Sequence, residues 1–265
     1  PFYRIYGGTQ DNNSLGGPSQ TRHSGGIPKG EWQVTLGGDG FWQAIDPENP
    51  DIVYSEYQYG NSIRYDRQSD ERIMIKPRPR KGEDTYRWNW NAPLIISPHK
   101  NTRLYAAANK LFRSDDRGMT WEVISDDLTR SLDRNKWKVM GRYWSNEAVR
   151  KDVSTSLYGT IVSLDESRLQ EDLIYVGTDD GLIQVTEDAA TWRKTEKFPG
   201  VPEYTYVSDI HTSKHNANVV FASFDNRKRD DFKPYLLKST DKGKSWESIA
   251  GDLPEDETVH TVVQD

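Results

Sequence analysis

Short apolar stretches alternate with turns rich in Asp, Asn, Pro and Lys along most of the chain, and one arrangement recurs four times. In each copy an apolar strand leads through a polar turn into a second strand that ends in an aromatic residue. The copies are GFWQAIDPENPDIVY ending at Tyr54, APLIISPHKNTRLY ending at Tyr105, GTIVSLDESRLQEDLIY ending at Tyr175 and VSDIHTSKHNANVVF ending at Phe221. This pattern predicts β-strands rather than helices.

The spacing of the repeats predicts the fold. The copies lie about 50 residues apart, except for about 70 between Tyr105 and Tyr175, and a unit of this size holds the four strands of a propeller blade. We therefore expect an all-β fold, a β-propeller of four-stranded blades closed by hairpins, with about five blades visible. One partial propeller domain is expected over 1–265, with blades at roughly 1–36, 37–90, 91–125, 156–203 and 204–254 and the start of a further blade at 258–265.

The ends and the widest gap add to this picture. The opening FYRIYGGTQDNNS, followed by GEWQVT, is expected to form the later strands of a blade, and Pro1 to be a processed or truncated start. Because an open array leaves unpaired strand edges, further blades or a partner subunit are expected to complete the ring. Residues 126–155 are polar without alternation and predict an insertion, with a helix near 146–153.

Two segments match the pattern S-x-D-x-G-x-[ST]-W, in which an Asp carboxylate accepts backbone N–H groups, Gly takes a positive φ and Trp packs on the sheet. Their matching residues are Ser114, Asp116, Gly118, Thr120 and Trp121 in the first, and Ser239, Asp241, Gly243, Ser245 and Trp246 in the second. A third copy, TEDAATW at 186–192, is one residue short and has Ala190 in place of Gly, so its hairpin should be distorted or shifted in register. These residues are expected to stabilise the fold.

With these motifs the chain resembles the Asp-box (BNR) repeat propellers, which include sialidases, two-domain xyloglucanases and sortilin-like receptor domains. The phrases YGGTQDNNS, GGDGFWQAIDPENPDIVY and IYVGTDDGLIQVTEDAATW are similar to those of large secreted bacterial proteins described as sortilin-like or glycosyl-hydrolase-like. The resemblance covers nearly the whole chain and implies a secreted or cell-envelope protein of bacteria.

The catalytic residues of these families do not carry over fully. Sialidases have an Arg-Ile-Pro motif, whereas this chain has Gly-Ile-Pro at 26–28. Xyloglucanases have a catalytic Asp in Tyr-x-x-x-Asp-x-Gly-Gly, and the similar stretch YSEYQYGN places Gln58 there, which cannot act as a base. Asp179, in the related phrase YVGTDDG, and Asp39, among Gly37, Gly38 and Gly40, remain weak catalytic candidates.

Propeller geometry favours a ligand face opposite these hairpins, formed by loops that lead into first strands or join second and third strands. Carboxylates, amides and flat aromatic rings gather in these loops and suit a sugar face or an extended peptide. Each ring could instead pack under its own loop. The expected ligand-binding residues are Asp11, Asn12, Asp39, Tyr57, Gln58, Trp88, Trp90, Tyr143, Trp144, Asp179 and Asp180.

The amino-acid composition limits the classes of ligand and cofactor that the chain is expected to bind. The 35 basic and 41 acidic residues are interspersed and give a net charge of −6, which argues against nucleic acid, and no apolar stretch is long enough to span a membrane. The chain has no Cys, and its five His lack ligand spacing, so no cofactor or zinc site is expected. Calcium at Asp11, Asp39 or Asp179 stays an open alternative because oxygen ligands are plentiful there.

Together these patterns predict an extracellular, non-catalytic propeller that binds a polysaccharide or a polypeptide through its aromatic loop face. A glycoside hydrolase with paired carboxylates is the first alternative. A structural subunit of a larger envelope assembly is the second.

Overall fold

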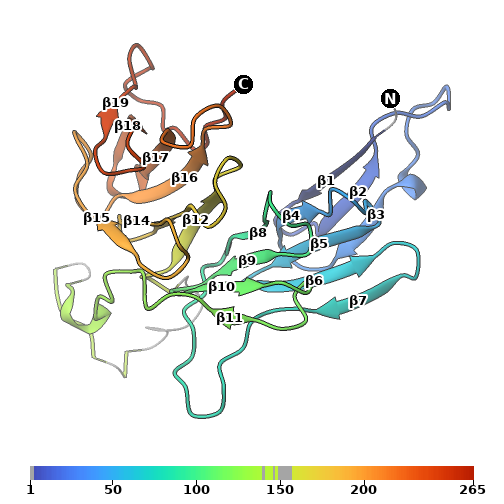
Figure 1. Ribbon diagram of the computed structural model, residues 1–265, viewed down its shortest axis with the longest axis horizontal. Helices are drawn as coiled ribbons and strands as arrows, with labels where there is room; N and C mark the ends of the chain where they lie inside the picture. The colour runs from blue at the N-terminus through green and yellow to red at the C-terminus, as the bar shows by residue number, and fades with distance from the viewer. Residues whose placement is uncertain (1–2, 139–140, 146, 149–156) are drawn as a thin grey trace. The chain divides into compact units, whose positions relative to one another are not determined.

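The computed structural model describes residues 3–138, 141–145, 147, 148 and 157–265, and their regular structure is antiparallel β-sheet with three short 3-10 turns (Figure 1). Those turns are η1 (Lys29–Glu31), η2 (Arg134–Lys136) and η3 (Arg227–Arg229). The expected all-β propeller fold is confirmed at the level of its blades. The helix expected near 146–153 lies mostly outside the described residues.

Consecutive strands form five separate sheets. The first sheet has three strands, β1 (Arg4–Gly8), β2 (Ser14–Pro18) and β3 (Gln33–Leu36). The second contains β4 (Gly40–Ile45), β5 (Ile52–Tyr57), β6 (Asn61–Asp66) and β7 (Glu71–Met74). The third contains β8 (Leu94–Ile96), β9 (Leu104–Ala107), β10 (Leu111–Ser114) and β11 (Glu122–Val123). The fourth contains β12 (Ile161–Glu166), β13 (Ile174–Thr178), β14 (Ile183–Thr186) and β15 (Arg193–Thr195). The fifth contains β16 (Tyr206–Thr212), β17 (Val220–Asn226), β18 (Asp231–Ser239) and β19 (Glu247–Ser248).

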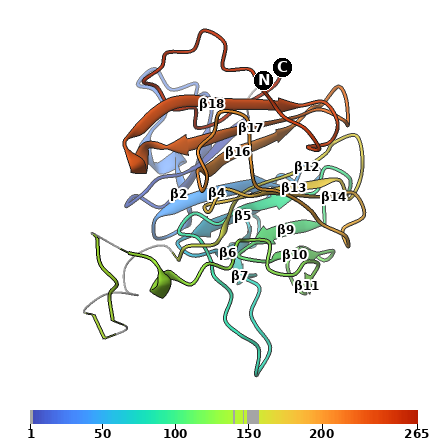
Figure 2. The same cartoon turned by 90° about the vertical axis from the view of Figure 1, so that its left-hand side faces the viewer.

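The sheets belong to two compact units. Unit 1 comprises Pro1–Asp84, Trp90–Ala107 and Phe112–Val123, and unit 2 comprises Thr85–Asn89, Ala108–Leu111 and Ile124–Asp265. In unit 1 the first strands of two blades, β4 and β8, lie side by side. In unit 2 β12 lies beside β16 (Figure 2), as first strands of propeller blades do. The prediction of one continuous propeller domain stays a prediction.

The first hairpin of each full blade is closed in the same way. The residue after the first strand is a buried Asp or Ser whose side-chain oxygen accepts the N–H two residues later. These residues are Asp46, Ser97, Ser167 and Ser213. The repeat in the sequence is therefore also a repeat in side-chain hydrogen bonding, because a buried turn must satisfy its backbone donors.

The hairpins between third and fourth strands carry the S-x-D-x-G-x-[ST]-W motifs. Asp241 Oδ1 accepts from Ser245 N at 2.8 Å, its Oδ2 accepts from Ser245 Oγ at 2.6 Å, and Ser239 Oγ accepts from Gly243 N at 2.7 Å. Hydrogen bonds to the Ser245 side chain and backbone hold the pKa of the Asp241 carboxyl at about 2. The hairpin of Asp116 repeats these bonds with Thr120.

The shortened third copy keeps its carboxylate bonds in a tighter turn. Asp188 Oδ1 accepts from Thr191 N at 2.7 Å, three residues on rather than four, and Ala189 takes a φ of 54°. Two of the motif tryptophans also bind residues that directly follow a strand: Trp121 Nε1 donates to Ile75 O at 2.6 Å, after β7, and Trp192 Nε1 donates to Ile124 O at 3.3 Å, after β11.

We expect Asp241→Ala to lower the free energy of unfolding by about 2 kcal/mol, because the turn loses several charge-assisted hydrogen bonds at once. Urea denaturation followed by tryptophan fluorescence measures the change. Asp252→Ala, at an exposed loop carboxylate of the same unit, serves as the control. Equal unfolding midpoints for the two variants would contradict a structural role for this carboxylate.

Candidate functional site

At one end of the sheets, here called the loop end of each unit, second strands turn into third strands and fourth strands lead into the next first strand. The same position is polar in three blades and binds the turn before its own first strand. Gln58 Oε1 accepts from Asp39 N at 3.3 Å, and Asn109 Oδ1 accepts from Arg87 N at 2.9 Å. Asp179 Oδ1 accepts from Thr160 N at 2.8 Å. An amide and a carboxylate thus do the same structural task.

Asp39 is a buried part of the unit 1 loop end. Its Oδ1 accepts from Asp11 N at 2.9 Å, so its carboxylate ties together two loops of that end. The preceding Gly38 has a φ of 110°, and a Cβ there would come within 3.3 Å of Tyr57, so glycine is required for this close approach. The cluster of glycines around Asp39 therefore has a structural use.

This loop end also holds a pair of aromatic rings. Tyr59 and Trp90 are both half-buried and meet edge to face, with ring centroids 4.9 Å apart and an interplanar angle of 76°. Tyr59 N also donates to Trp90 O at 3.1 Å. Tyr59 has a φ of 65°, a left-handed conformation that is costly for a bulky residue.

Beneath this pair lies a buried glutamate. Glu56 is fully buried on β5, and its Oε1 accepts from Gly60 N at 2.9 Å, the residue that follows Tyr59. Burial raises the pKa of Glu56 to about 9, although nearby backbone donors and Lys76 oppose the shift. The carboxyl is therefore protonated at neutral pH and supports the loop from below.

At the loop end of unit 2, two consecutive carboxyls are bound by their own turns. Asp179 accepts from Gly159 N at 2.9 Å as well as from the backbone and hydroxyl of Thr160, and burial raises its pKa to about 7. Asp180 accepts from Thr178 Oγ1 and from Arg130 N at 2.8 Å, and burial raises its pKa as well. Both oxygens of Asp179 are already engaged.

Aromatic side chains surround these carboxyls. Burial raises the pKa of Tyr158 to about 12, with contributions from the charges of Asp180 and Asp179, and burial likewise raises the pKa of Tyr206. Tyr204 has a φ of 62°, and its ring packs edge to face with Trp137 at a centroid distance of 5.4 Å. As in unit 1, a strained loop position holds an aromatic ring.

The predicted ligand residues divide between the two units. In unit 1 lie Asp11, Asn12, Asp39, Tyr57, Gln58 and Trp90; in unit 2 lie Trp88, Tyr143, Trp144, Asp179 and Asp180. Trp88 is buried, with 7% of its surface exposed, and offers little ring face to a ligand, whereas Tyr143 is 61% exposed. Within each unit the predicted residues occupy the loop end, and whether they bind a ligand stays a prediction.

Sequence reasoning passed over Tyr59, Glu56 and the tyrosines at 158, 204 and 206. Tyr59 directly follows the predicted residues Tyr57 and Gln58, and its position before Gly60 in a turn was the available indication. Glu56 gave a weaker one, as a lone carboxylate inside an otherwise uncharged strand.

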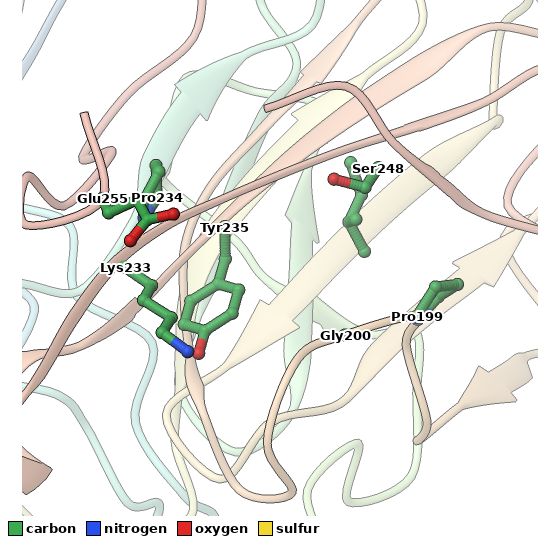
Figure 3. A pocket seen from close by; sticks show the side chains of 8 residues that line it. Pro199, Gly200, Lys233, Pro234, Tyr235, Ser248 and Glu255 are labelled. Carbon is green, nitrogen blue, oxygen red and sulfur yellow. The ribbon is translucent and has the colours of Figure 1, made fainter. Parts of the chain in front are cut away.

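Two pockets lie away from the predicted ligand residues. One, of about 440 Å³, lies in unit 2 beside β18 (Figure 3), and the other, of about 340 Å³, lies beside the Asp116 hairpin. The first is lined by Pro199, Gly200, Lys233, Pro234, Tyr235, Leu237, Ser248 and Glu255. The second is lined by Met74, Ile75, Lys76, Arg78, Gly118, Met119 and Trp121.

Among the residues that the structure describes, no His, Asp and Glu side chains form a group of three or more that could hold a metal ion. Asp39 and Asp179 direct carboxylate oxygens to backbone N–H groups instead, and calcium binding stays an untested prediction. Within the same residues, no helix is long and apolar enough to cross a membrane.

The chain is similar in sequence to a xyloglucanase. No family model matches it. It is 25% identical over 240 residues to xyloglucanase Xgh74A of Acetivibrio thermocellus, a match that covers 82% of this chain but only 26% of that protein. The chain therefore corresponds to a minor part of this curated relative.

Solved structures support the same fold. An ancestral GH74 enzyme matches with a TM-score of 0.64 at 13% identity, over 96% of this chain and 30% of that one. The extracellular domain of a B. thetaiotaomicron protein, described as a hybrid two component system, matches with a TM-score of 0.56 at 14% identity, over 96% of this chain and 27% of that one. At these identities the likeness concerns the fold alone.

Proposed function

We propose that the chain is a secreted bacterial propeller region of the Asp-box type that binds a polysaccharide at the loop end of unit 1 without cleaving it. The observation that carries the proposal is the Tyr59–Trp90 pair, two half-buried rings that keep part of their surface in solvent beside the polar Gln58. Sugar rings bind through their apolar faces to aromatic side chains and through hydroxyls to amides and carboxylates. The similarity to a xyloglucanase makes a neutral β-glucan such as xyloglucan the ligand to test first.

The strain at Tyr59 supports this function. A left-handed tyrosine costs about 1 to 2 kcal/mol compared with glycine at the same position. Two side chains offset that cost: Glu56 holds Gly60 from below, and Trp90 packs against the ring and binds the Tyr59 N–H. A fold that only needed a turn here would have no use for a large ring in this conformation.

Non-catalytic binding is favoured over hydrolysis by the state of the carboxyls. Gln58 stands at the position that the resemblance gives to a catalytic Asp, and Asp179, at the equivalent position, is bound through both oxygens to its own turn. A retaining or inverting hydrolase needs two free carboxyls facing one glycosidic bond. Hydrolysis stays the alternative because the pKa of Asp179, raised by burial to about 7, suits a general acid.

The test is xyloglucan binding by Tyr59→Ala and Tyr59→Gly, measured by affinity electrophoresis and isothermal titration calorimetry. We expect both variants to bind about tenfold more weakly, since a stacked ring contributes about 1.4 kcal/mol. Tyr59→Gly should retain the stability of the parent chain, because relief of the left-handed strain offsets the lost contact with Trp90.

Tyr3→Ala, at a tyrosine that is 61% exposed, is the matched control and should bind like the parent chain. Unchanged binding by the Tyr59 variants would refute the proposed site. Release of reducing sugar by the parent chain would favour the hydrolase alternative. Binding only to a protein of the native envelope fraction would favour a polypeptide ligand or a structural subunit.

A further inference from the structure

The loop end of unit 2 differs in chemistry from that of unit 1, because its aromatic rings carry cations. The Arg130 guanidinium lies 4.6 Å from the Tyr204 centroid and the Lys228 ammonium 5.7 Å from that of Tyr206. In the segment that follows Trp137, two more pairs occur, Lys138 with Tyr143 at 5.7 Å and Arg142 with Trp144 at 3.8 Å.

Contacts bring these elements together. Trp137 packs on Tyr204, Arg229 donates to Tyr204 O at 3.0 Å, and Arg130 donates through Nε to Asp180 O at 2.8 Å. The charges of Arg229 and Arg130 both act on Tyr158. Three stretches of unit 2 therefore contribute to one surface, which we call the cationic aromatic surface: the described residues 130–138 with 141–144, then 204–206 and 227–229.

Several of its cations have no carboxylate partner. Among the described residues, Lys138, Arg142, Lys228 and Arg229 form no ion pair. Two carboxylates of the neighbouring strands and loops are already paired: Asp225 with Arg227 Nε at 3.1 Å, and Glu196 with Arg130 at 3.5 Å.

The remaining acidic side chains do not outweigh the positive charge of this surface. Asp179 and Asp180 are buried, and the exposed carboxylates on these loops, such as Glu203 and Asp230, are fewer than the cations. The surface therefore attracts negative charge, although the whole chain has a net charge of −6.

We propose that this surface is a second binding site, separate from the Tyr59–Trp90 site, and that it takes a carboxylated polysaccharide such as a polyuronate. Cations that cover ring faces leave those faces less open to a neutral sugar or a nucleic acid base. The exposed guanidinium and ammonium groups instead match carboxylates, while ring edges and the Tyr158 hydroxyl match sugar hydroxyls.

The test uses polygalacturonate and its fully methyl-esterified form, a matched pair of polymers that differ in charge. At low ionic strength we expect the parent chain to bind polygalacturonate at least tenfold more tightly than the ester, and added salt to weaken only the former. The double variant Lys228→Gln with Arg229→Gln should bind polygalacturonate about tenfold more weakly, since two exposed charge contacts are lost.

The control is Lys214→Gln with Lys244→Gln, which removes the same charge from exposed positions in the turns at the opposite end of unit 2 and should not change binding. Equal binding of both polymers, no binding of polygalacturonate, or tighter binding of a single-stranded DNA oligonucleotide would each overturn the proposal. Xyloglucan binding by the same double variant, expected to be unchanged, separates this site from the proposed site at Tyr59.

Discussion

Glu56→Gln is expected to raise the free energy of unfolding at pH 7 by about 3 kcal/mol and to flatten its dependence on pH. Burial raises the folded-state pKa of Glu56 from its ordinary value of 4.5 to about 9, so the folded protein holds a proton that the unfolded chain releases. The part of the unfolding free energy that depends on this proton is therefore fully present below about pH 4.5 and is lost as pH rises toward 9. A neutral glutamine of the same size removes this loss.

Urea denaturation at pH 5, 7 and 9, followed by tryptophan fluorescence, measures the effect. The advantage of the variant over the parent chain should grow with each step in pH. Glu71→Gln, at an exposed glutamate on β7 in the same unit, provides the matched control, and its curve should run parallel to that of the parent. Parallel curves for Glu56→Gln would mean that Glu56 ionises in the folded state as readily as in the unfolded one.

The same variant examines the link between Glu56 and Tyr59. Glu56 Oε1 accepts from Gly60 N, and the Oε1 of glutamine can accept the same bond. Xyloglucan binding should therefore persist in Glu56→Gln, whereas Glu56→Ala should weaken it through loss of support for the loop. This difference distinguishes a residue that positions Tyr59 from one that touches the ligand.

The blades could be predicted because each repeats the same local solution. Tyr54, Tyr105 and Tyr175 are all fully buried on second strands, and the turn before each strand contains a capping Asp or Ser. Local rules of alternation and turn chemistry fix such features within about 15 residues, so one sequence contains enough information to find them.

The candidate sites could be predicted only to the level of loops. A positive φ at Tyr59 or Tyr204 follows from contacts with residues distant in sequence, such as Trp90 and Trp137, and no local pattern reports it. Glu56 has its raised pKa because neighbouring strands bury it, and burial of that kind depends on how blades pack.

The polar position after the second strand, Gln58 in one blade and Asp179 in another, could be found from the sequence, but its role could not. Sequence comparison equated Gln58 with Asp179 and treated the amide as a lost catalytic group. The structure gives both side chains the same bond, to the N–H of the turn before their own first strand. The difference between them is therefore compatible with a shared structural role, and substitution at Asp179 can decide between that role and catalysis.

We expect Asp179→Asn to change the free energy of unfolding at pH 5 by less than about 1 kcal/mol, and Asp179→Ala to lower it by about 3 kcal/mol. Asparagine keeps an acceptor for the N–H groups of Gly159 and Thr160, as Gln58 does in its own blade, whereas alanine leaves two buried donors without a partner. At pH 5 the wild-type carboxyl is mostly protonated, because burial raises its pKa to about 7, so the comparison isolates hydrogen bonding.

At higher pH the same variant has a second expected effect. The parent chain should lose stability as pH rises from about 4 toward 7, since the unfolded state then releases a proton that folded Asp179 keeps, and Asp179→Asn should not. Xyloglucan binding should be unchanged in both variants. If the parent chain instead hydrolyses a polysaccharide and Asp179→Asn lowers the rate by about 100-fold or more, as loss of a general acid does, the carboxyl is catalytic and its hydrogen bonds serve to set its pKa.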